Sequence, residues 1–105
     1  MGNGLDAAEA PGAFAFETIT VAGTAIGFTA GTYQPTGEVG AKRAIVTCET
    51  AQVRFRYDGT DPSATVGHLL DIGNKLEIEG YTNISLFRAI RTGGTSCALS
   101  VTFER

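Results

Sequence analysis

The amino-acid sequence predicts an all-β fold, an antiparallel β-sandwich of jelly-roll or immunoglobulin-like type with about seven or eight short strands. Three observations lead to this prediction. Apolar and polar residues alternate with a period of two in several short segments, turn signals rich in Gly, Asp and Pro recur about every ten residues, and helical periodicity is missing over any useful length. β-branched and aromatic residues are frequent, while Trp is absent. The 105 residues suffice for one domain with one hydrophobic core.

The amino-terminal part is expected to combine a flexible arm with two strands. Residues 1–13 are small, acidic and interrupted by Gly and Pro, which predicts a flexible N-terminal arm ahead of a single β-sandwich domain over residues 14–105. The strand that begins at Phe14 has no sharply polar face, which is typical of a strand covered on both sides or at an oligomer contact. A second short strand is predicted over residues 24–30, where Gly27 indicates a bulge or a close backbone approach.

The longest predicted loop precedes the clearest strand of the chain. Residues 31–41 contain one Pro and three Gly, and a loop of this length in a compact domain is often functional. Strands are predicted over residues 42–50 and 52–57, and the short connection between them predicts an antiparallel hairpin. The sequence DGTDP at residues 58–62 then predicts a turn, because Asp and Gly tolerate unusual backbone angles and Pro cannot continue a central strand. The residues expected to face the core from the second strand are Val53, Phe55 and Tyr57.

The carboxy-terminal half continues as short strands and turns. A strand or extended segment at residues 64–70 leads into a turn at residues 71–74. Further strands are predicted over residues 76–80, 84–92 and 96–105, with apolar side chains inward and polar side chains such as Glu77 and Glu79 outward. The inward residues of the first and last of these strands are Leu76, Ile78, Cys97, Leu99, Val101 and Phe103.

The chain has two cysteines, Cys48 and Cys97, which are too few for a disulfide-rich scaffold. Each lies in an apolar, strand-like run, where a free cysteine behaves as a small hydrophobic residue. Two buried thiols are therefore the favoured interpretation. A bridge between neighbouring strands stays open, because the sequence does not define the separation of the two Cα atoms.

Catalysis would have to involve His68, the single histidine of the chain. Ser63, His68 and Asp71 have the side chains of a catalytic triad, but no G-x-S-x-G motif surrounds the serine. Pairing His68 with Cys48 or Cys97 would need a thiolate at a position that the strand pattern directs into the core, where a thiolate is disfavoured. We therefore expect that the protein is not an enzyme and has no catalytic residues.

Metal, phosphate and nucleic-acid sites lack their usual signatures as well. The cysteines and the histidine are not at zinc-finger spacing, and turn formation explains Asp58 and Asp61 better than weak calcium binding does. Neither a P-loop nor a dinucleotide-binding G-x-G-x-x-G motif occurs. The net charge of -3 is too small to suggest a nucleic-acid binder. We therefore expect no cofactor, no metal and no nucleic-acid partner.

Surface residues offer two further hypotheses. Arg54, Arg56, Arg88 and Arg91 can form a basic stripe across paired strands, although cross-strand ion pairs with Glu77 and Glu79 are the simpler interpretation. Tyr33 and Tyr81 lie in predicted loops and are candidates for stacking on sugars or bases. The acidic residues of the first 38 positions, which have no Lys or Arg among them, are interpreted as a solvated arm.

No membrane segment or targeting signal is predicted. The sequence has no apolar run of about 18 residues, and its first residues lack the basic and apolar regions of a signal peptide. The opening Met-Gly is not a myristoylation site by pattern, because Asp6 stands where Ser or Thr is expected. We therefore expect synthesis in the cytoplasm and no contact with a membrane.

Five motifs lie between Val53 and Phe103: DGTDP at the end of a strand, SATVGHLL, GNKLEI, FRAIRTG and the terminal VTF. Together they resemble a group of small virion proteins, of about 100 residues, that tailed bacteriophages and prophages encode. The resemblance implies a structural virion protein, a capsid decoration or cement protein that binds and stabilises the head shell. It also implies a location on the capsid surface after synthesis in the bacterial host cytoplasm, the major capsid protein as partner, and a closed homo-oligomer, a dimer or trimer.

A second, local resemblance concerns the segments YDGTDPSAT and FRAIRTGG. They are similar to immunoglobulin-like modules that are appended to some bacterial glycosidases. This resemblance implies an antiparallel sandwich and no catalytic residue. It leaves an alternative function open, a carbohydrate- or receptor-binding module of a phage fibre or tail. In either case the arm and the loop at residues 31–41 are where contacts with a partner are expected.

Overall fold

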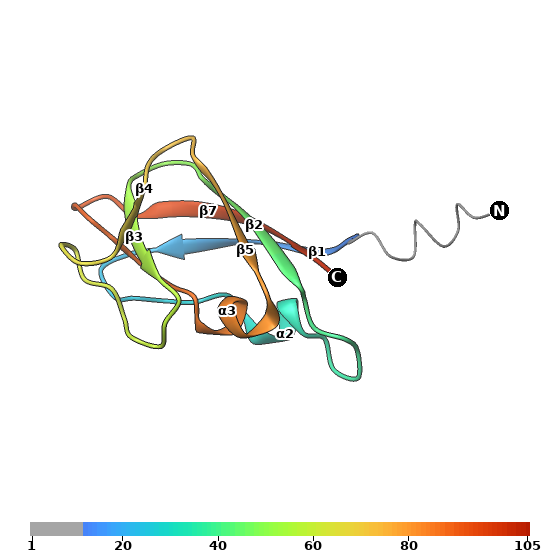
Figure 1. Ribbon diagram of the computed structural model, residues 1–105. Helices are drawn as coiled ribbons and strands as arrows, with labels where there is room; N and C mark the ends of the chain where they lie inside the picture. Colours follow the sequence, from blue (N-terminus) through green and yellow to red (C-terminus); the bar gives the residue numbers. More distant parts are fainter. Residues whose placement is uncertain (1–11) are drawn as a thin grey trace.

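A computed structural model describes residues 12–105 and confirms the antiparallel β-sandwich (Figure 1). Within these residues, seven strands form one sheet of four and one sheet of three, and every pairing is antiparallel. In spatial order, the four-stranded sheet contains β1 (Ala13–Val21), β7 (Cys97–Glu104), β2 (Arg43–Cys48) and β5 (Lys75–Glu79). The three-stranded sheet contains β4 (His68–Leu70), β3 (Val53–Arg56) and β6 (Arg88–Arg91).

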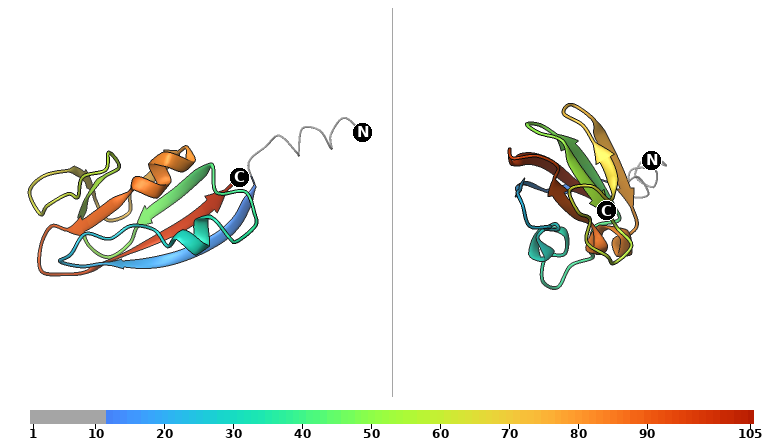
Figure 2. Two further views of the ribbon diagram at one scale, coloured as in Figure 1. Left: turned by 90° about the horizontal axis from the view of Figure 1, so that it is seen from below. Right: turned by 90° about the vertical axis from the view of Figure 1, so that its left-hand side faces the viewer.

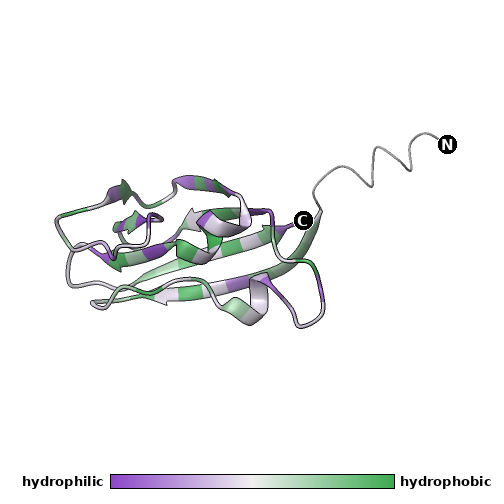
Figure 3. Ribbon diagram, turned by 60° about the horizontal axis from the view of Figure 1, so that its bottom comes forward, coloured by the Kyte–Doolittle hydropathy of each residue, from purple (hydrophilic) through white to green (hydrophobic). Residues whose placement is uncertain are grey.

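The hydrophobic core lies between the two sheets. Alternation with a period of two is clearest in β7, where every second residue is buried, and Figure 3 shows the corresponding bands of hydrophobic and hydrophilic residues along the strands. In β5, Ile78 is buried while Glu77 and Glu79 are exposed, as the sequence predicted. The largest fully buried side chains are Phe87, Phe103, Ile84, Leu99, Val21, Val46, Val53, Val101, Cys48 and Cys97.

The amino-terminal boundary of the domain differs slightly from the prediction. Gly12 donates its N–H to the carbonyl oxygen of Arg105 at 3.0 Å, and the N–H of Arg105 donates to the carbonyl oxygen of Gly12 at 3.1 Å. Strand β1 begins at Ala13, so the last two residues assigned to the arm belong to the sheet. The remainder of the predicted arm, residues 1–11, lies outside the described residues.

Two short helices replace structure that was predicted as strand or loop. Helix α2 (Ala30–Tyr33) opens the predicted loop, and helix α3 (Tyr81–Leu86) includes the first three residues of the strand predicted over residues 84–92. Gly80 has a positive φ of 95°, which turns the chain out of β5, and Ile84 then fills the core from the helix. The helices are neighbours at one side of the sandwich (Figures 1 and 2). Neither of these helices, the ones found in residues 12–105, is long and apolar enough to cross a membrane.

Two predictions about strand pairing are wrong. Residues 24–30 form no strand and make only one bridge, between Ile26 and Ala89, although a close approach at Gly27 is confirmed. Strands β2 and β3 do not form a hairpin, because they lie in different sheets. Both edges of β2 are already occupied, one by β5 and the other by β7. The short connection at residues 49–52 therefore carries the chain from one sheet to the other instead of reversing it within a sheet.

Candidate functional site

The residues considered for catalysis are engaged in separate local contacts. The Ser63 hydroxyl oxygen accepts the backbone N–H groups of Thr65 at 3.3 Å and Val66 at 3.0 Å, which is the hydrogen bonding of a Ser turn. His68 starts β4 as an exposed residue, and Asp71 accepts a hydrogen bond from the side chain of Gln52. No hydrogen bond within residues 12–105 joins the serine, the histidine and the aspartate.

The two cysteines are free thiols buried in the core, which confirms the favoured interpretation of the sequence. Their sulfur atoms lie 3.4 Å apart. Neither sulfur has a hydrogen bond to His68. In the part of the chain that the structure describes, no group of three or more His, Cys, Asp or Glu side chains is placed to hold a metal ion.

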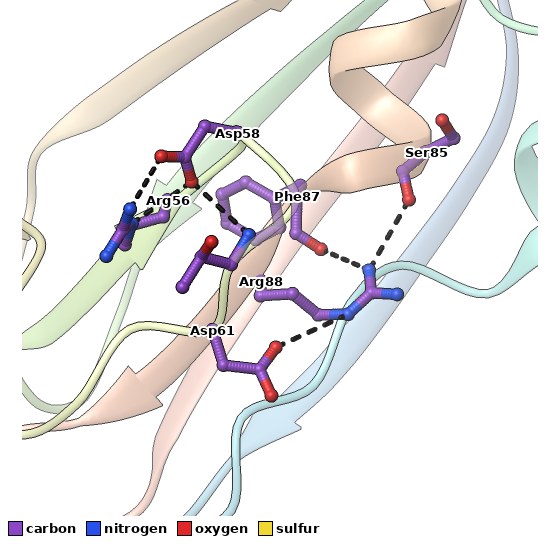
Figure 4. Close-up of polar contacts among 7 residues, drawn as sticks. Arg56, Asp58, Asp61, Ser85, Phe87 and Arg88 are labelled. Carbon is purple, nitrogen blue, oxygen red and sulfur yellow. Dashed lines mark hydrogen bonds and ion pairs between the residues drawn. The ribbon is translucent and has the colours of Figure 1, made fainter.

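Two aspartates of the DGTDP turn form ion pairs with two arginines (Figure 4). Arg56 donates from Nε and Nη2 to the two carboxylate oxygens of Asp58, at 3.0 and 2.6 Å. The Nε of Arg88 lies 4.0 Å from a carboxylate oxygen of Asp61. Arg56 and Arg88 face each other across β3 and β6, where two like charges would repel each other. The turn therefore neutralises a cross-strand pair of positive charges.

This arrangement corrects the ion pairs that the sequence suggested for the arginines. Glu77 and Glu79 lie on β5 in the four-stranded sheet, whereas all four arginines lie in the three-stranded sheet. Arg54 instead donates to the backbone carbonyl oxygens of Ala64 and Gly67, at 3.1 and 2.8 Å, and so ties the loop before β4 to β3. Arg88 donates to the carbonyl oxygens of Ser85 and Phe87, and Arg91 to the hydroxyl group of Ser96. The four arginines therefore contact the segments that flank their own sheet.

The stability of the protein is expected to depend on pH through the carboxyl group of Asp58. Its hydrogen bond with Arg56 lowers the pKa of the carboxyl group below the ordinary value, so the folded chain binds this proton less tightly than the unfolded chain does. The resulting stabilisation is present above the unfolded pKa and is lost as the pH falls through the folded pKa. We expect Asp58→Asn to lower stability near neutral pH and to have little effect near pH ~2. Urea denaturation at both pH values measures this.

The matched control for this prediction is Asp61→Asn, because Asp61 belongs to the same turn but contacts its arginine only at 4.0 Å. A smaller loss of stability near neutral pH is expected for this variant, since the longer contact is a weaker one. Equal pH profiles for the wild-type chain and Asp58→Asn would show that the ion pair with Arg56 does not act on stability.

A groove of about 540 Å³ opens between β4 and β5. These two strands are consecutive in the chain and are joined by a turn in which Asn74 donates its N–H to the carbonyl oxygen of Asp71 at 3.0 Å. The strands then enter different sheets, so their outer edges separate, as Figure 1 shows. The residues that line the groove are Phe55, Tyr57, His68, Leu69, Leu76, Glu77, Ile78, Glu79 and Asn83. We call this surface the β4–β5 groove.

The two walls of the β4–β5 groove differ in chemistry. One wall is aromatic and apolar: the ring of Phe55 lies 5.3 Å from the ring of His68 and 6.3 Å from that of Tyr57. The prediction that Tyr57 faces the core is wrong, because its side chain is 41% exposed, and Leu69 is 49% exposed. The other wall carries the carboxylate groups of Glu77 and Glu79. The groove can thus contact an apolar side chain on one side and a positive charge on the other.

The backbone adds a third property to the β4–β5 groove. Among residues 12–105, strand β4 pairs only with β3 and strand β5 pairs only with β2, so each strand is the edge of its sheet. An edge strand has backbone N–H and carbonyl groups that can pair with an added extended segment. The groove therefore combines apolar surface, negative charge and two strand edges in one place.

The two tyrosines in predicted loops, Tyr33 and Tyr81, have less side-chain surface free for a ligand than the sequence suggested. Tyr33 is only 8% exposed and packs against Tyr81 and Phe103, with ring centroids 5.8 and 6.0 Å away, so its prediction as a stacking platform is wrong. Tyr81 is partly exposed, and its hydroxyl group bonds the side chain of Gln34. Arg105 holds the loop from the other side by donating to the carbonyl oxygen of Val39 at 3.0 Å.

Sequence reasoning did not identify the β4–β5 groove, although one signal for it was present. Leu69 and Leu70 are adjacent in β4, and adjacent residues of a strand point to opposite faces. One of the two leucines therefore had to leave the core. Leu70 is 5% exposed and Leu69 is 49% exposed.

Comparisons of the chain with protein-family models, with curated proteins and with solved structures find no match. The geometry of the β4–β5 groove and the motifs in the sequence are therefore the basis for a functional proposal. Both concern the same stretch of chain. The groove residues from Phe55 to Ile78 belong to the segment in which the motifs DGTDP, SATVGHLL and GNKLEI occur.

Proposed function

We propose that this protein is a structural component of a bacteriophage particle, a decoration protein that binds the major capsid protein on the outside of the head shell and stabilises the shell. The observation that carries the proposal is that two of the motifs line one surface. SATVGHLL contributes His68 and Leu69 to the β4–β5 groove, and GNKLEI contributes Leu76 and Ile78. A third motif, DGTDP, directly follows the groove residue Tyr57.

The β4–β5 groove suits a protein partner that presents an extended segment. Such a segment would add to the free edge of β4 or β5 through backbone hydrogen bonds, an interaction that needs no particular side chains. Specificity would come from an apolar residue against Tyr57 and Leu69 and a Lys or Arg near Glu77 and Glu79. A ligand that binds only the assembled coat stabilises that assembly by mass action. The groove thus provides the kind of contact that a decoration protein needs.

A second surface supports a closed homo-oligomer, a dimer or trimer, as the unit that binds. The outward residues of β1 are Phe16, Thr18 and Thr20, all exposed, and Phe16 is 60% exposed. The strand is also the edge of the four-stranded sheet. No segment of residues 12–105 covers this face of β1, which favours the oligomer contact over the alternative of a strand covered on both sides.

Binding to purified phage capsids that lack the decoration protein tests the proposal. We expect the wild-type chain to co-sediment with expanded capsids and to raise their melting temperature. Leu69→Asp should weaken binding at least about tenfold, because it places a charge on the apolar wall of the groove. The residue is largely exposed, so the sandwich should remain folded.

Ile72→Asp is the matched control for this experiment. Ile72 is 61% exposed in the turn after β4 and does not line the β4–β5 groove. This variant should bind capsids like the wild-type chain, because it adds the same charge at a neighbouring exposed position. Undiminished binding by Leu69→Asp, or an equal loss in both variants, would reject the groove as the contact surface. Failure of the wild-type chain to bind capsids would reject the proposed function.

A carbohydrate- or receptor-binding module of a phage fibre or tail is the second candidate. One observation favours it: the exposed ring of Tyr57 lies in the same groove as two carboxylates and the amide of Asn83, and aromatic rings beside polar groups bind sugars. A glycan array distinguishes the candidates. Glycan binding by the wild-type chain that Tyr57→Ala abolishes would support this candidate, and an array without binding would leave the capsid proposal in place.

A further inference from the structure

The two buried thiols lie where a cross-link between the central strands of the four-stranded sheet can form. Cys48 is the last residue of β2 and Cys97 is the first residue of β7, and both side chains are fully buried. In the register of these strands Cys48 lies opposite Leu99, so the two cysteines are diagonal neighbours on the inner face. Their sulfur atoms are 3.4 Å apart, and a disulfide bond requires an approach to about 2.05 Å.

The surroundings distinguish the two thiols. Burial raises the pKa of Cys48 to about 12, and its Sγ lies 3.0 Å from the carbonyl oxygen of Ala51, to which it donates. Burial also acts to raise the pKa of Cys97, but backbone hydrogen bonds from Thr50, Ala51 and Glu49 outweigh it and lower that pKa on balance. The thiolate is the reactive form of cysteine. The Cys97 thiol also donates to the carbonyl oxygen of Ala98 at 3.3 Å. The opposite directions of the two pKa shifts assign the first attack to Cys97, and Cys48 is next to it as the resolving thiol.

Both cysteines lie at strand ends, next to exposed residues. Glu49 and Thr50 follow Cys48 and are exposed, and the exposed residues 93–95 precede Cys97 by two positions. Three hydrogen bonds, from Glu49 N–H to the carbonyl oxygen of Ala98, from the Thr50 hydroxyl to the carbonyl oxygen of Ser96 and from Ala98 N–H to the Thr50 hydroxyl, hold the two strand ends together. Local opening of these turns would expose the sulfur atoms without separating the two sheets.

We propose that Cys48 and Cys97 are a site of oxidative modification, which a low-molecular-weight disulfide such as oxidised glutathione converts into an intramolecular disulfide. The Cys97 thiolate attacks one sulfur of the oxidant, whose S–S bond breaks and releases one thiolate. Cys48 loses its proton to solvent and attacks the Cys97 sulfur, and the second thiolate leaves. One disulfide is consumed, one is formed, and two molecules of reduced thiol are released.

The cross-link would close a loop between residues 49 positions apart in the chain. It would join β2 to β7, the two strands that have neighbours on both sides in the four-stranded sheet. Closing such a loop reduces the conformational entropy of the unfolded chain, so the oxidised protein should be the more stable form. A chain made in a reducing cytoplasm would acquire this stability only after it reaches an oxidising medium. The inference stands whether or not the chain binds a capsid.

Oxidation of the full chain tests this inference. Reduced protein is incubated with oxidised glutathione, and intact mass, thiol content under denaturing conditions and melting temperature are measured. We expect both thiols to disappear, the mass to fall by about 2 Da without a glutathione adduct, and the chain to run as a single chain on a non-reducing denaturing gel. The melting temperature should rise by about 10 °C or more, and dithiothreitol should reverse all three changes.

The single variants Cys48→Ala and Cys97→Ala are matched controls. Cys48→Ala should accumulate one glutathione adduct on Cys97, whereas Cys97→Ala should react several-fold more slowly, and neither should gain stability. Any of three results would overturn the proposal. The wild-type chain could carry two glutathione adducts, it could form cross-linked pairs of chains, or it could keep both thiols under conditions that modify Cys48→Ala. If an alanine variant does not fold, the wild-type chain alone tests the proposal, by incubation with oxidised glutathione in subdenaturing urea. Two thiols that remain after this incubation would overturn the proposal.

Discussion

Replacing Phe87 with alanine is expected to lower the free energy of unfolding by about 3–5 kcal/mol, the largest change expected for any substitution considered for this protein. Phe87 is fully buried at the junction of α3 and β6. Its ring stacks on Phe28 with centroids 4.3 Å apart and an angle of 1° between the ring planes, and it lies 5.8 Å from the ring of Phe55. Alanine would leave a cavity between the loop after β1 and the three-stranded sheet. Urea denaturation followed by circular dichroism measures the loss.

Ile72→Ala is the control for this prediction, because it removes a large apolar side chain from an exposed position outside the proposed contact surfaces. Ile72 is 61% exposed in the turn after β4, so the loss should be below about 1 kcal/mol. Comparable losses in both variants would mean that the aromatic cluster around Phe87 is not the centre of the core.

Gly27→Ala is expected to destabilise the chain by about 1–3 kcal/mol, although it adds a single methyl group. A Cβ at this position would lie 2.6 Å from the carbonyl oxygen of Phe87 and would also clash with Nη1 of Arg88. The arginine can move, but the carbonyl oxygen belongs to the backbone. Hydrogen bonds of 3.0 and 2.8 Å between Ile26 and Ala89 hold the two segments together beside the contact. The segment would have to move away from β6, which weakens the stacking of Phe28 on Phe87. Thermal and urea denaturation measure the change.

Gly31→Ala is the matched control, with the same substitution four residues further along the chain. Gly31 lies in α2, and an added Cβ there would meet no atom within 4 Å. Alanine is the better helix former, so this variant should keep or slightly raise the stability of the chain. A wild-type melting temperature for Gly27→Ala would show that the close approach to Phe87 is not tight in solution.

The features that could be predicted from the sequence depend on neighbouring residues alone. Alternation of apolar and polar residues is a property of the strand itself, and it placed Leu99, Val101 and Phe103 on the inner face of β7, where they are fully buried. Asp58 accepts a hydrogen bond from the backbone N–H of Thr60 at 3.4 Å, as expected for an Asx side chain in a turn.

The features that were missed depend on residues far away in the chain. The segment from Tyr81 to Leu86 has the composition of a turn and a strand, but it forms a helix because its Ile84 fills a place in the core. Tyr33 appeared to be a loop residue, but Tyr81 and Phe103 cover it. Local propensity is weak compared with the burial of a large side chain, so tertiary contacts decide such segments.

The sequence alone contains the motifs of the candidate site, but it does not show that they lie together at the β4–β5 groove. It determined the fold class, the inner face of the main strands and the positions of the turns, because alternation and turn chemistry act over a few residues. The tertiary structure alone decided that β7 lies between β1 and β2, that β2 and β3 belong to different sheets, and that β4 and β5 separate into a groove. The physical reason is that the partner of each strand depends on every other strand in the chain, including strands that are far away in the sequence. The unpaired edges of β4 and β5 can therefore be identified only when the pairing of all the other strands is known.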